Sequence, residues 1–180
     1  KNTQLEGLAD LYARVVQKVG SRKIDQYESI NKKFANVSKN IGSTSAVSLF
    51  DNIVENFYSG KKTNFQKEED FFASLEQVFH TELNDDEIGI FNQVITDIAK
   101  LDTESVFADE RLTNMMRDFF ENEYHESDYA LINKLLKPIA ESSTSTTEYL
   151  NRLGQALMAV LYLGINNASD DQVAYIGELL

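Results

Sequence analysis

Residues 84–98, which read NDDEIGIFNQVITDI, combine a helix start with an apolar stripe at helical spacing. Asn84 and Glu87 stand three residues apart, as in a capping box, where each side chain accepts a backbone N–H of the other residue. Apolar residues then recur at intervals of three or four, at Ile88, Phe91, Val94, Ile95 and Ile98. Because residues with this spacing share one face of a helix, the stretch predicts an amphipathic helix.

The same kind of pattern extends over most of the chain. Apolar stripes predict further helices at residues 5–19, 24–41, 43–57, 65–83, 109–124, 127–136, 150–163 and 169–180. No segment alternates as a strand would, and we find no internal repeat at the period of a solenoid protein. With 11 Phe and 8 Tyr in the sequence, we expect an all-α, multi-helix bundle of about nine helices with an aromatic-rich core.

Two segments refine this expectation. Residues 150–163 form the most apolar window, which is too short and too polar to span a bilayer of ~30 Å, so we expect a helix at the centre of the bundle. Pro138 follows the stripe at residues 127–136. Because proline lacks an N–H and disfavours a helical residue before it, we expect Pro138 to end or kink that helix.

Charge is distributed unevenly along the chain, whose formal net charge is −12 at pH 7. Residues 1–67 carry a net charge of +5, and residues 68–180 carry −17. The best linker candidate, residues 59–64, lies just before this change. The chain is therefore a single all-α domain over residues 1–180, or a basic helical unit at 1–60 joined to an acidic helical bundle at 64–180.

Several kinds of chemistry are excluded by residue identity. The sequence has no cysteine, which excludes disulfides, thiolate catalysis and Cys-based metal sites. A phosphate-loop motif would require glycine where Glu55 stands, and an EF-hand would require an oxygen ligand where Ile95 stands. We therefore expect no cofactor and assign no catalytic or metal-ligating residues.

One cluster forms a tentative polar site. Asp118, Glu121 and His125 would line one face of a helix, at a spacing from which a metal could be held. Glu123 falls within the apolar stripe of that helix, where a buried acid would have a perturbed pKa of the kind that active sites use. The ordinary alternatives are a solvated helix face and a helix terminus that reaches solvent.

Basic residues in the first third of the chain form a tentative partner surface. They are Arg22, Lys23, Lys32, Lys33, Lys61 and Lys62. Asp25 and Glu28 share the polar side of the helix at residues 24–41 with its lysines, so no uninterrupted basic stripe exists. We therefore expect no nucleic-acid binding. A solvated face, or docking against the acidic remainder of the chain or a protein partner, fits this pattern better.

These observations favour a non-enzymatic helical module that binds another protein as an adaptor, regulator or inhibitor. A first alternative is a bundle that encloses a small apolar or aromatic ligand, lined by Met115, Met116, Phe119 and Phe120. A second is a carboxylate-dependent enzyme or a metal-binding protein. We expect a soluble chain without a membrane span, either cytoplasmic or processed after export. Partner identity and oligomeric state stay open.

Overall fold

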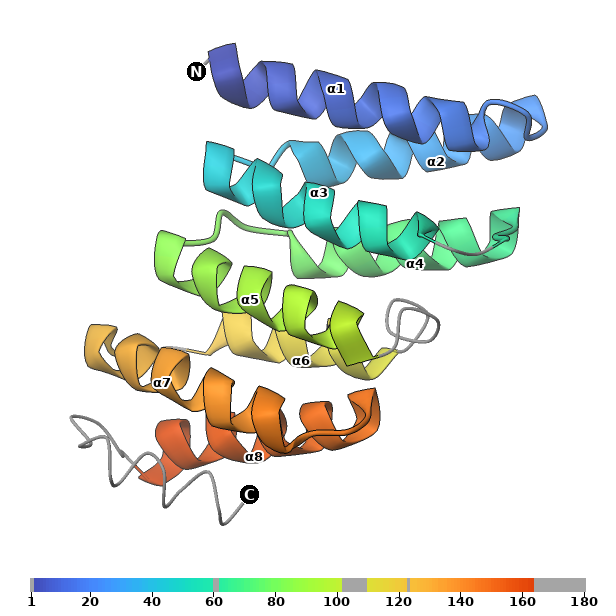
Figure 1. Cartoon of the computed structure of the whole chain (residues 1–180). Coiled ribbons are helices and arrows are strands. Elements are labelled where there is room, and N and C mark those ends of the chain that lie inside the picture. Colours follow the sequence, from blue (N-terminus) through green and yellow to red (C-terminus); the bar gives the residue numbers. More distant parts are fainter. Residues whose placement is uncertain (1, 60–61, 102–109, 123, 164–180) are drawn as a thin grey trace.

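A computed structural model describes residues 2–59, 62–101, 110–122 and 124–163, which form eight α-helices and no strand (Figure 1). The helices are α1 (Asn2–Val19), α2 (Ile24–Ser38), α3 (Thr44–Tyr58), α4 (Phe65–Val78), α5 (Asp85–Leu101), α6 (Glu110–Glu121), α7 (Glu126–Ser142) and α8 (Thr146–Leu163). The all-α prediction is confirmed, with eight described helices against about nine expected. The helix predicted at 169–180 lies outside the described residues.

The helices form four consecutive pairs that are stacked one on the next (Figure 1). Helices α1, α3, α5 and α7 pack side by side as a first layer, and α2, α4, α6 and α8 pack side by side as a second layer. Each pair therefore contacts mainly the pairs before and after it, which is the architecture of an α-solenoid. None of these described helices is long and apolar enough to cross a membrane.

Buried residues in the second layer recur with a period of 41 positions. Three series run through α2, α4, α6 and α8, and no member is more than 6% exposed. They are Ile30-Phe71-Leu112-Leu153, Phe34-Leu75-Met116-Leu157 and Val37-Val78-Phe119-Val160. The expectation that the chain has no solenoid repeat is therefore wrong. The repeat escapes sequence comparison because it preserves apolar character at each position and not the amino acid.

The first layer has the same period from α3 onward, with no member of its series more than 3% exposed. The series are Leu49-Ile90-Leu131, Phe50-Phe91-Ile132, Ile53-Val94-Leu135 and Val54-Ile95-Leu136. Aromatic rings join the two layers, as where Phe34 of α2 lies 5.2 Å from Phe50 of α3 between ring centroids. The aromatic-rich core is thus part of the contact between layers.

Helix starts follow the predicted capping chemistry. The Asn84 N–H donates to Glu87 Oε1 at 3.1 Å, and the Glu87 N–H donates to Asn84 Oδ1 at 2.8 Å, so the capping box is confirmed. The equivalent bond 41 residues later runs from the His125 N–H to Asp128 Oδ2, at 2.9 Å. These local bonds place the starts of α5 and α7 at the same phase of the repeat.

Two expectations about single helices need adjustment. The apolar helix near residues 150–163 is present as α8, and it is the last described helix of the stack instead of a central one. Its residue Met158 is 62% exposed. Pro138 does not end α7, which continues to Ser142. Its neighbours Leu136 and Ile139 are buried, so their packing compensates for the backbone hydrogen bond that proline removes.

Helices on the two sides of residues 59–64 pack directly against each other. Helix α2 contacts α4, and α3 contacts α5. The buried apolar residues from Leu11 to Val160 belong to one cluster. The division of the chain near residue 60 stays a prediction, which folding of the isolated segment would test.

Gly89, the fifth of the 17 residues of α5, offers a test of helix packing. A Cβ added at Gly89 meets no heavy atom within 4 Å. We expect Gly89→Ala to raise the free energy of unfolding by about 1 kcal/mol, because alanine loses less backbone entropy on entering a helix. Chemical denaturation measures this change. In α1, the Cβ of Gly7→Ala would lie 2.9 Å from Val47 Cγ1, so its gain should be smaller or reversed. Equal gains in the two variants would contradict this packing.

Candidate functional site

A groove of about 990 Å³ lies between α6 and α8, the last two helices that the structure describes in the second layer. Its apolar lining comes from both helices and comprises Met115, Phe119, Leu150, Leu157, Met158 and Leu161. Its polar lining includes Arg111, Asn114, Asp118, Glu121, Asn122, Asn151 and Gln155. The groove therefore combines an apolar surface with hydrogen-bonding groups and two carboxylates, a mixture that is typical of binding sites.

Gly154 keeps the α8 side of the groove open. A Cβ at this position would lie 3.4 Å from Met115 Cε on α6, so a larger side chain would occupy the space between the helices. Met158 lies one turn further along α8 and is largely exposed. Methionine side chains are flexible and polarisable, so a lining with Met115 and Met158 can adapt to the shape of a bound side chain.

Two carboxylates, of Asp118 and Glu121, lie on the exposed surface of α6 beside the groove. Asp118 Oδ1 lies 4.0 Å from Arg117 Nε, and Glu121 Oε1 lies 3.6 Å from Nε2 of His80, which follows the end of α4. Contacts at these distances between exposed groups contribute little free energy. Both carboxylates therefore retain the capacity to bind a cationic group that approaches the groove.

The structure divides the tentative polar site between two helices. Asp118 and Glu121 lie on α6, which ends at Glu121, whereas His125 precedes the first residue of α7. The three residues do not share one helix face, because that spacing requires the helix to continue to residue 125. Glu123 lies outside the described residues. Among the residues that the structure does describe, no group of three or more His, Asp or Glu is arranged to hold a metal ion.

The residues expected to line a ligand pocket are also divided. Met115 and Phe119 line the groove, as that alternative requires. Met116 is buried in the core, and Phe120 packs against Phe91 with ring centroids 5.3 Å apart. Helix periodicity places Met115 and Met116 on different sides of α6, so only one of the two faces the groove.

Arg22, a member of the basic partner surface, is engaged within the fold. Its Nε donates to Glu68 Oε1 at 2.8 Å, and its Nη2 donates to the Thr63 carbonyl at 3.1 Å. Tyr58 Oη donates to the other carboxylate oxygen of Glu68 at 2.9 Å. Glu68 is fully buried, so this network satisfies a buried charge where the α1–α2 loop, α3 and α4 meet.

The other basic residues differ in their surroundings. Lys33 donates to Ser29 Oγ at 3.0 Å and lies 3.7 Å from Glu69 of α4. Lys23, Lys32 and Lys62 are exposed, and Lys61 lies outside the described residues. Arg22 and Lys33 thus connect the basic first part of the chain to the acidic α4.

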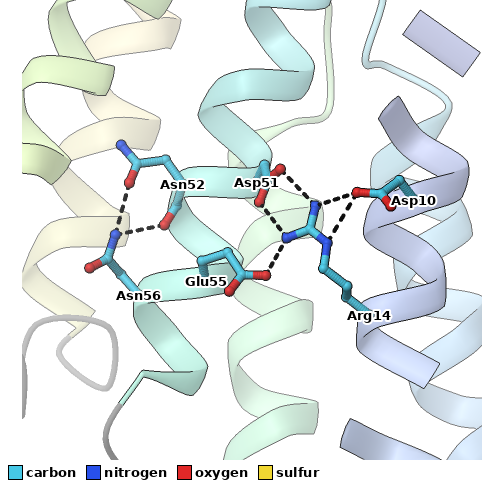
Figure 2. Close-up of polar contacts among 6 residues, drawn as sticks. All are labelled: Asp10, Arg14, Asp51, Asn52, Glu55 and Asn56. Atoms are coloured by element: carbon cyan, nitrogen blue, oxygen red, sulfur yellow. Dashed lines mark hydrogen bonds and ion pairs between the residues drawn. The ribbon is translucent and has the colours of Figure 1, made fainter. Parts of the chain in front are cut away.

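Arg14 joins the first two helix pairs, a contact that our sequence interpretation missed. Arg14 Nη1 and Nη2 donate to the two carboxylate oxygens of Asp51 at 2.9 and 2.7 Å, and Nη1 also donates to Glu55 (Figure 2). Asp10 lies on the other side of the guanidinium, 3.2 Å from Nε. The sequence contained one signal for this contact. Arg14 and Glu55 carry opposite charges and stand 41 positions apart, which is the period of the repeat.

Hydrogen bonds between asparagine side chains extend this polar network from α3 to α5. Asn52 Nδ2 donates to Asn92 Oδ1 at 2.7 Å, which links α3 to α5. Asn56 Nδ2 donates to Asn52 Oδ1 at 2.8 Å within α3 (Figure 2). These groups bond to one another, so they stabilise the alignment of neighbouring helix pairs. The candidate functional site is the α6–α8 groove.

Glu68 and Glu69 give a matched test of the buried network. We expect Glu68→Ala to lower the free energy of unfolding by about 3 kcal/mol, because it leaves Arg22 without its buried partner. Glu69→Ala removes a partly exposed contact with Lys33 at 3.7 Å and the 2.8 Å hydrogen bond that Ser29 Oγ donates to Glu69 Oε2, and it should cost about 1 kcal/mol. Urea denaturation of both variants measures the difference, and similar losses would argue against a buried ion pair at Glu68.

The raised pKa values of Tyr149 and Tyr58 predict a loss of stability at alkaline pH. Burial, followed by the nearby Asp97 carboxylate, raises the pKa of Tyr149, and burial followed by Glu68 raises that of Tyr58. Because the folded pKa exceeds the unfolded value of about 10, the stabilisation is complete below pH 10. It is lost above pH 10, where only the unfolded chain releases the proton.

The Tyr149→Phe variant isolates this effect. Its melting temperature should fall less steeply than that of the parent chain between pH 9 and 11, although the variant loses the 3.2 Å hydrogen bond to Asp97 at neutral pH. Tyr27→Phe is the control, because a hydrogen bond with Asn31 lowers the pKa of Tyr27. The assignment fails if Tyr149→Phe leaves the alkaline slope unchanged.

Comparisons of this chain with protein-family models, with curated proteins and with solved structures return no match.

Proposed function

We propose that this chain is a non-enzymatic scaffold that binds another protein, and that the α6–α8 groove holds an amphipathic helix of the partner. The observation that carries this proposal is the composition of the groove, in which methionine, phenylalanine and leucine side chains lie beside two exposed carboxylates. A partner helix with an apolar face flanked by lysine or arginine would complement both parts of this lining.

The shape of the groove supports a helix as its occupant. Met115 and Phe119 lie four residues apart on α6, and Gly154 and Met158 lie four residues apart on α8. The apolar lining therefore extends along both helices for at least one turn. An amphipathic helix presents its anchoring side chains at the same spacing of three or four residues, so several can enter the groove together.

Charge supports a basic partner. The chain has a formal net charge of −12, which is the sum of +5 for residues 1–67 and −17 for residues 68–180. An excess of negative charge accelerates the approach of a basic partner and weakens binding of an acidic one. Because Asp118 and Glu121 beside the groove are exposed, the preference should decrease as salt is added.

Designed peptides test this proposal directly. One peptide carries leucines on one helical face and lysines elsewhere, and a second replaces every lysine with glutamate. We expect saturable binding of the lysine peptide, measured by fluorescence anisotropy, and at least tenfold weaker binding of the glutamate peptide. Met158→Asp should weaken binding of the lysine peptide by about tenfold or more, because it places a charge on the apolar lining of the groove. Asp118→Lys combined with Glu121→Lys should reverse the preference between the two peptides.

Ile24→Asp is the matched control for Met158→Asp. Ile24 is also a large, exposed apolar residue, but it lies on α2 and away from the groove. Its substitution should leave the affinity for the lysine peptide unchanged. Equal losses in the two variants, or equal affinity for the two peptides, would count against a basic helix in the α6–α8 groove.

The alternative of a small apolar ligand also has an observation in its favour, because Met115 and Phe119 both line the groove. Such a ligand would raise the melting temperature of the parent chain in a saturable way. Gly154→Leu, which fills the space beside Met115, would abolish that increase. This outcome, without binding of the lysine peptide, would favour the ligand over the partner helix.

A further inference from the structure

The two ends of the α6–α8 groove differ in charge. The charged residues of its described lining are Arg111, Asp118 and Glu121, all on α6. Arg111 is the second residue of this helix and Glu121 is the last. At a rise of about 1.5 Å per residue, they stand about 15 Å apart along the helix axis. Both lining carboxylates therefore lie toward one end of the groove, which we call the Glu121 end, and the other is the Arg111 end.

Helices α6 and α8, which lie side by side in the second layer, run in the same direction (Figure 1). Arg111 Nη2 donates to Thr147 Oγ1 at 3.2 Å, near the start of both helices. One turn further along α6, Met115 lies beside Gly154 of α8. Because later residues of α6 meet later residues of α8, both helices start at the Arg111 end and run toward the Glu121 end.

This parallel arrangement gives the groove an electrostatic direction. A helix carries a partial positive charge at its N-terminus and a partial negative charge at its C-terminus. Asp118 and Glu121 therefore lie where the dipole of α6 is also negative, and the two effects favour a cation there. The first-turn acids Glu110 and Glu148 are not part of the groove lining, and Glu148 lies 3.2 Å from Arg152. The Arg111 end is therefore less negative than the Glu121 end.

We propose that the partner helix lies antiparallel to α6 and α8, with its N-terminal half and its lysine or arginine residues at the Glu121 end. In this orientation the positive end of the partner helix meets the carboxylates, and its negative end meets the starts of α6 and α8. This inference rests on the proposed function. It specifies the partner as an amphipathic helix whose cationic residues are concentrated in its first half.

The lining also sets the length of the partner segment. On α8 it extends from Leu150 to Leu161. This distance corresponds to about three helical turns. A peptide of three to four turns is therefore long enough to place one end beside Glu121 and the other beside Arg111.

Two peptides of identical composition test the orientation. Both carry leucines on one helical face, and both have acetylated and amidated ends, which removes their terminal charges. The first has its lysines in the N-terminal half, and the second has them in the C-terminal half. We expect the first to bind about fivefold more tightly in calorimetric titrations. Lysines near a C-terminus stabilise an isolated helix, so the helicity of the free peptides would favour the second one instead.

A nitroxide label on the peptide reports its direction in the groove. Attached to the N-terminus of the first peptide, the label should broaden the amide resonance of Glu121 more than that of Arg111. Attached to the C-terminus, it should broaden the resonance of Arg111 more. The opposite pattern would overturn the antiparallel orientation and would leave a helix in the groove.

Removal of the two carboxylates tests the cause of the preference. Asp118→Asn combined with Glu121→Gln should reduce the difference between the peptides to about twofold or less. Asp25→Asn combined with Glu28→Gln is the matched control, because it makes the same change of charge at exposed positions of α2. This control should retain the full difference.

The outcomes separate this inference from the proposed function. Equal affinity of the parent chain for the two peptides, or an undiminished difference in the Asp118 and Glu121 double variant, would overturn the orientation alone. If the parent chain binds neither of these peptides nor the peptide with lysines along its whole length, the proposed function fails and the orientation fails with it.

Discussion

The contact between each helix pair and the next, made by apolar residues at the same positions every 41 residues, stabilises the whole structure. Each fully buried Leu, Ile, Phe or Met side chain contributes about 1.5–3 kcal/mol relative to exposure. The series through Ile30 and Phe34 in the second layer and through Leu49 and Ile53 in the first layer supply such residues to each interface. Stability in this arrangement is approximately a sum over neighbouring pairs, so each pair depends on the next.

Hydrogen bonds and ion pairs between neighbouring helix pairs fix the alignment that the apolar contacts alone do not specify. Hydrophobic burial is not directional, whereas a guanidinium that donates to two carboxylate oxygens requires one alignment. Arg14 on Asp51 aligns the first pair with the second, and Asn52 on Asn92 aligns the second with the third. Arg22 of the α1–α2 loop donates to the buried Glu68 of α4, and this bond also joins the first pair to the second. The basic and acidic parts of the chain therefore meet inside the fold as well as on its surface.

The groove lies where two described helices of unequal length meet in the second layer. Helix α6 has 12 residues and α8 has 18, and Gly154 contributes no side chain where α8 faces Met115. Apolar surface that inner helices would cover is accessible there, beside Asp118 and Glu121. Both proposals for partner and ligand use this surface, and they differ in whether the exposed carboxylates contribute to binding.

The sequence by itself determined the local features of this protein. The helix starts at Ser43, Asn64 and Asn84 and the apolar stripes follow from contacts between residues three or four positions apart, which a pattern reveals directly. Only the tertiary structure decided that the helices stack in pairs, that α8 lies at the end of the described stack and that α6 ends before His125. The stacking depends on contacts between residues about 41 positions apart, where any apolar side chain of suitable size is acceptable. Residue identity therefore carries little record of them, and the groove between α6 and α8 exists only once the two helices are in place.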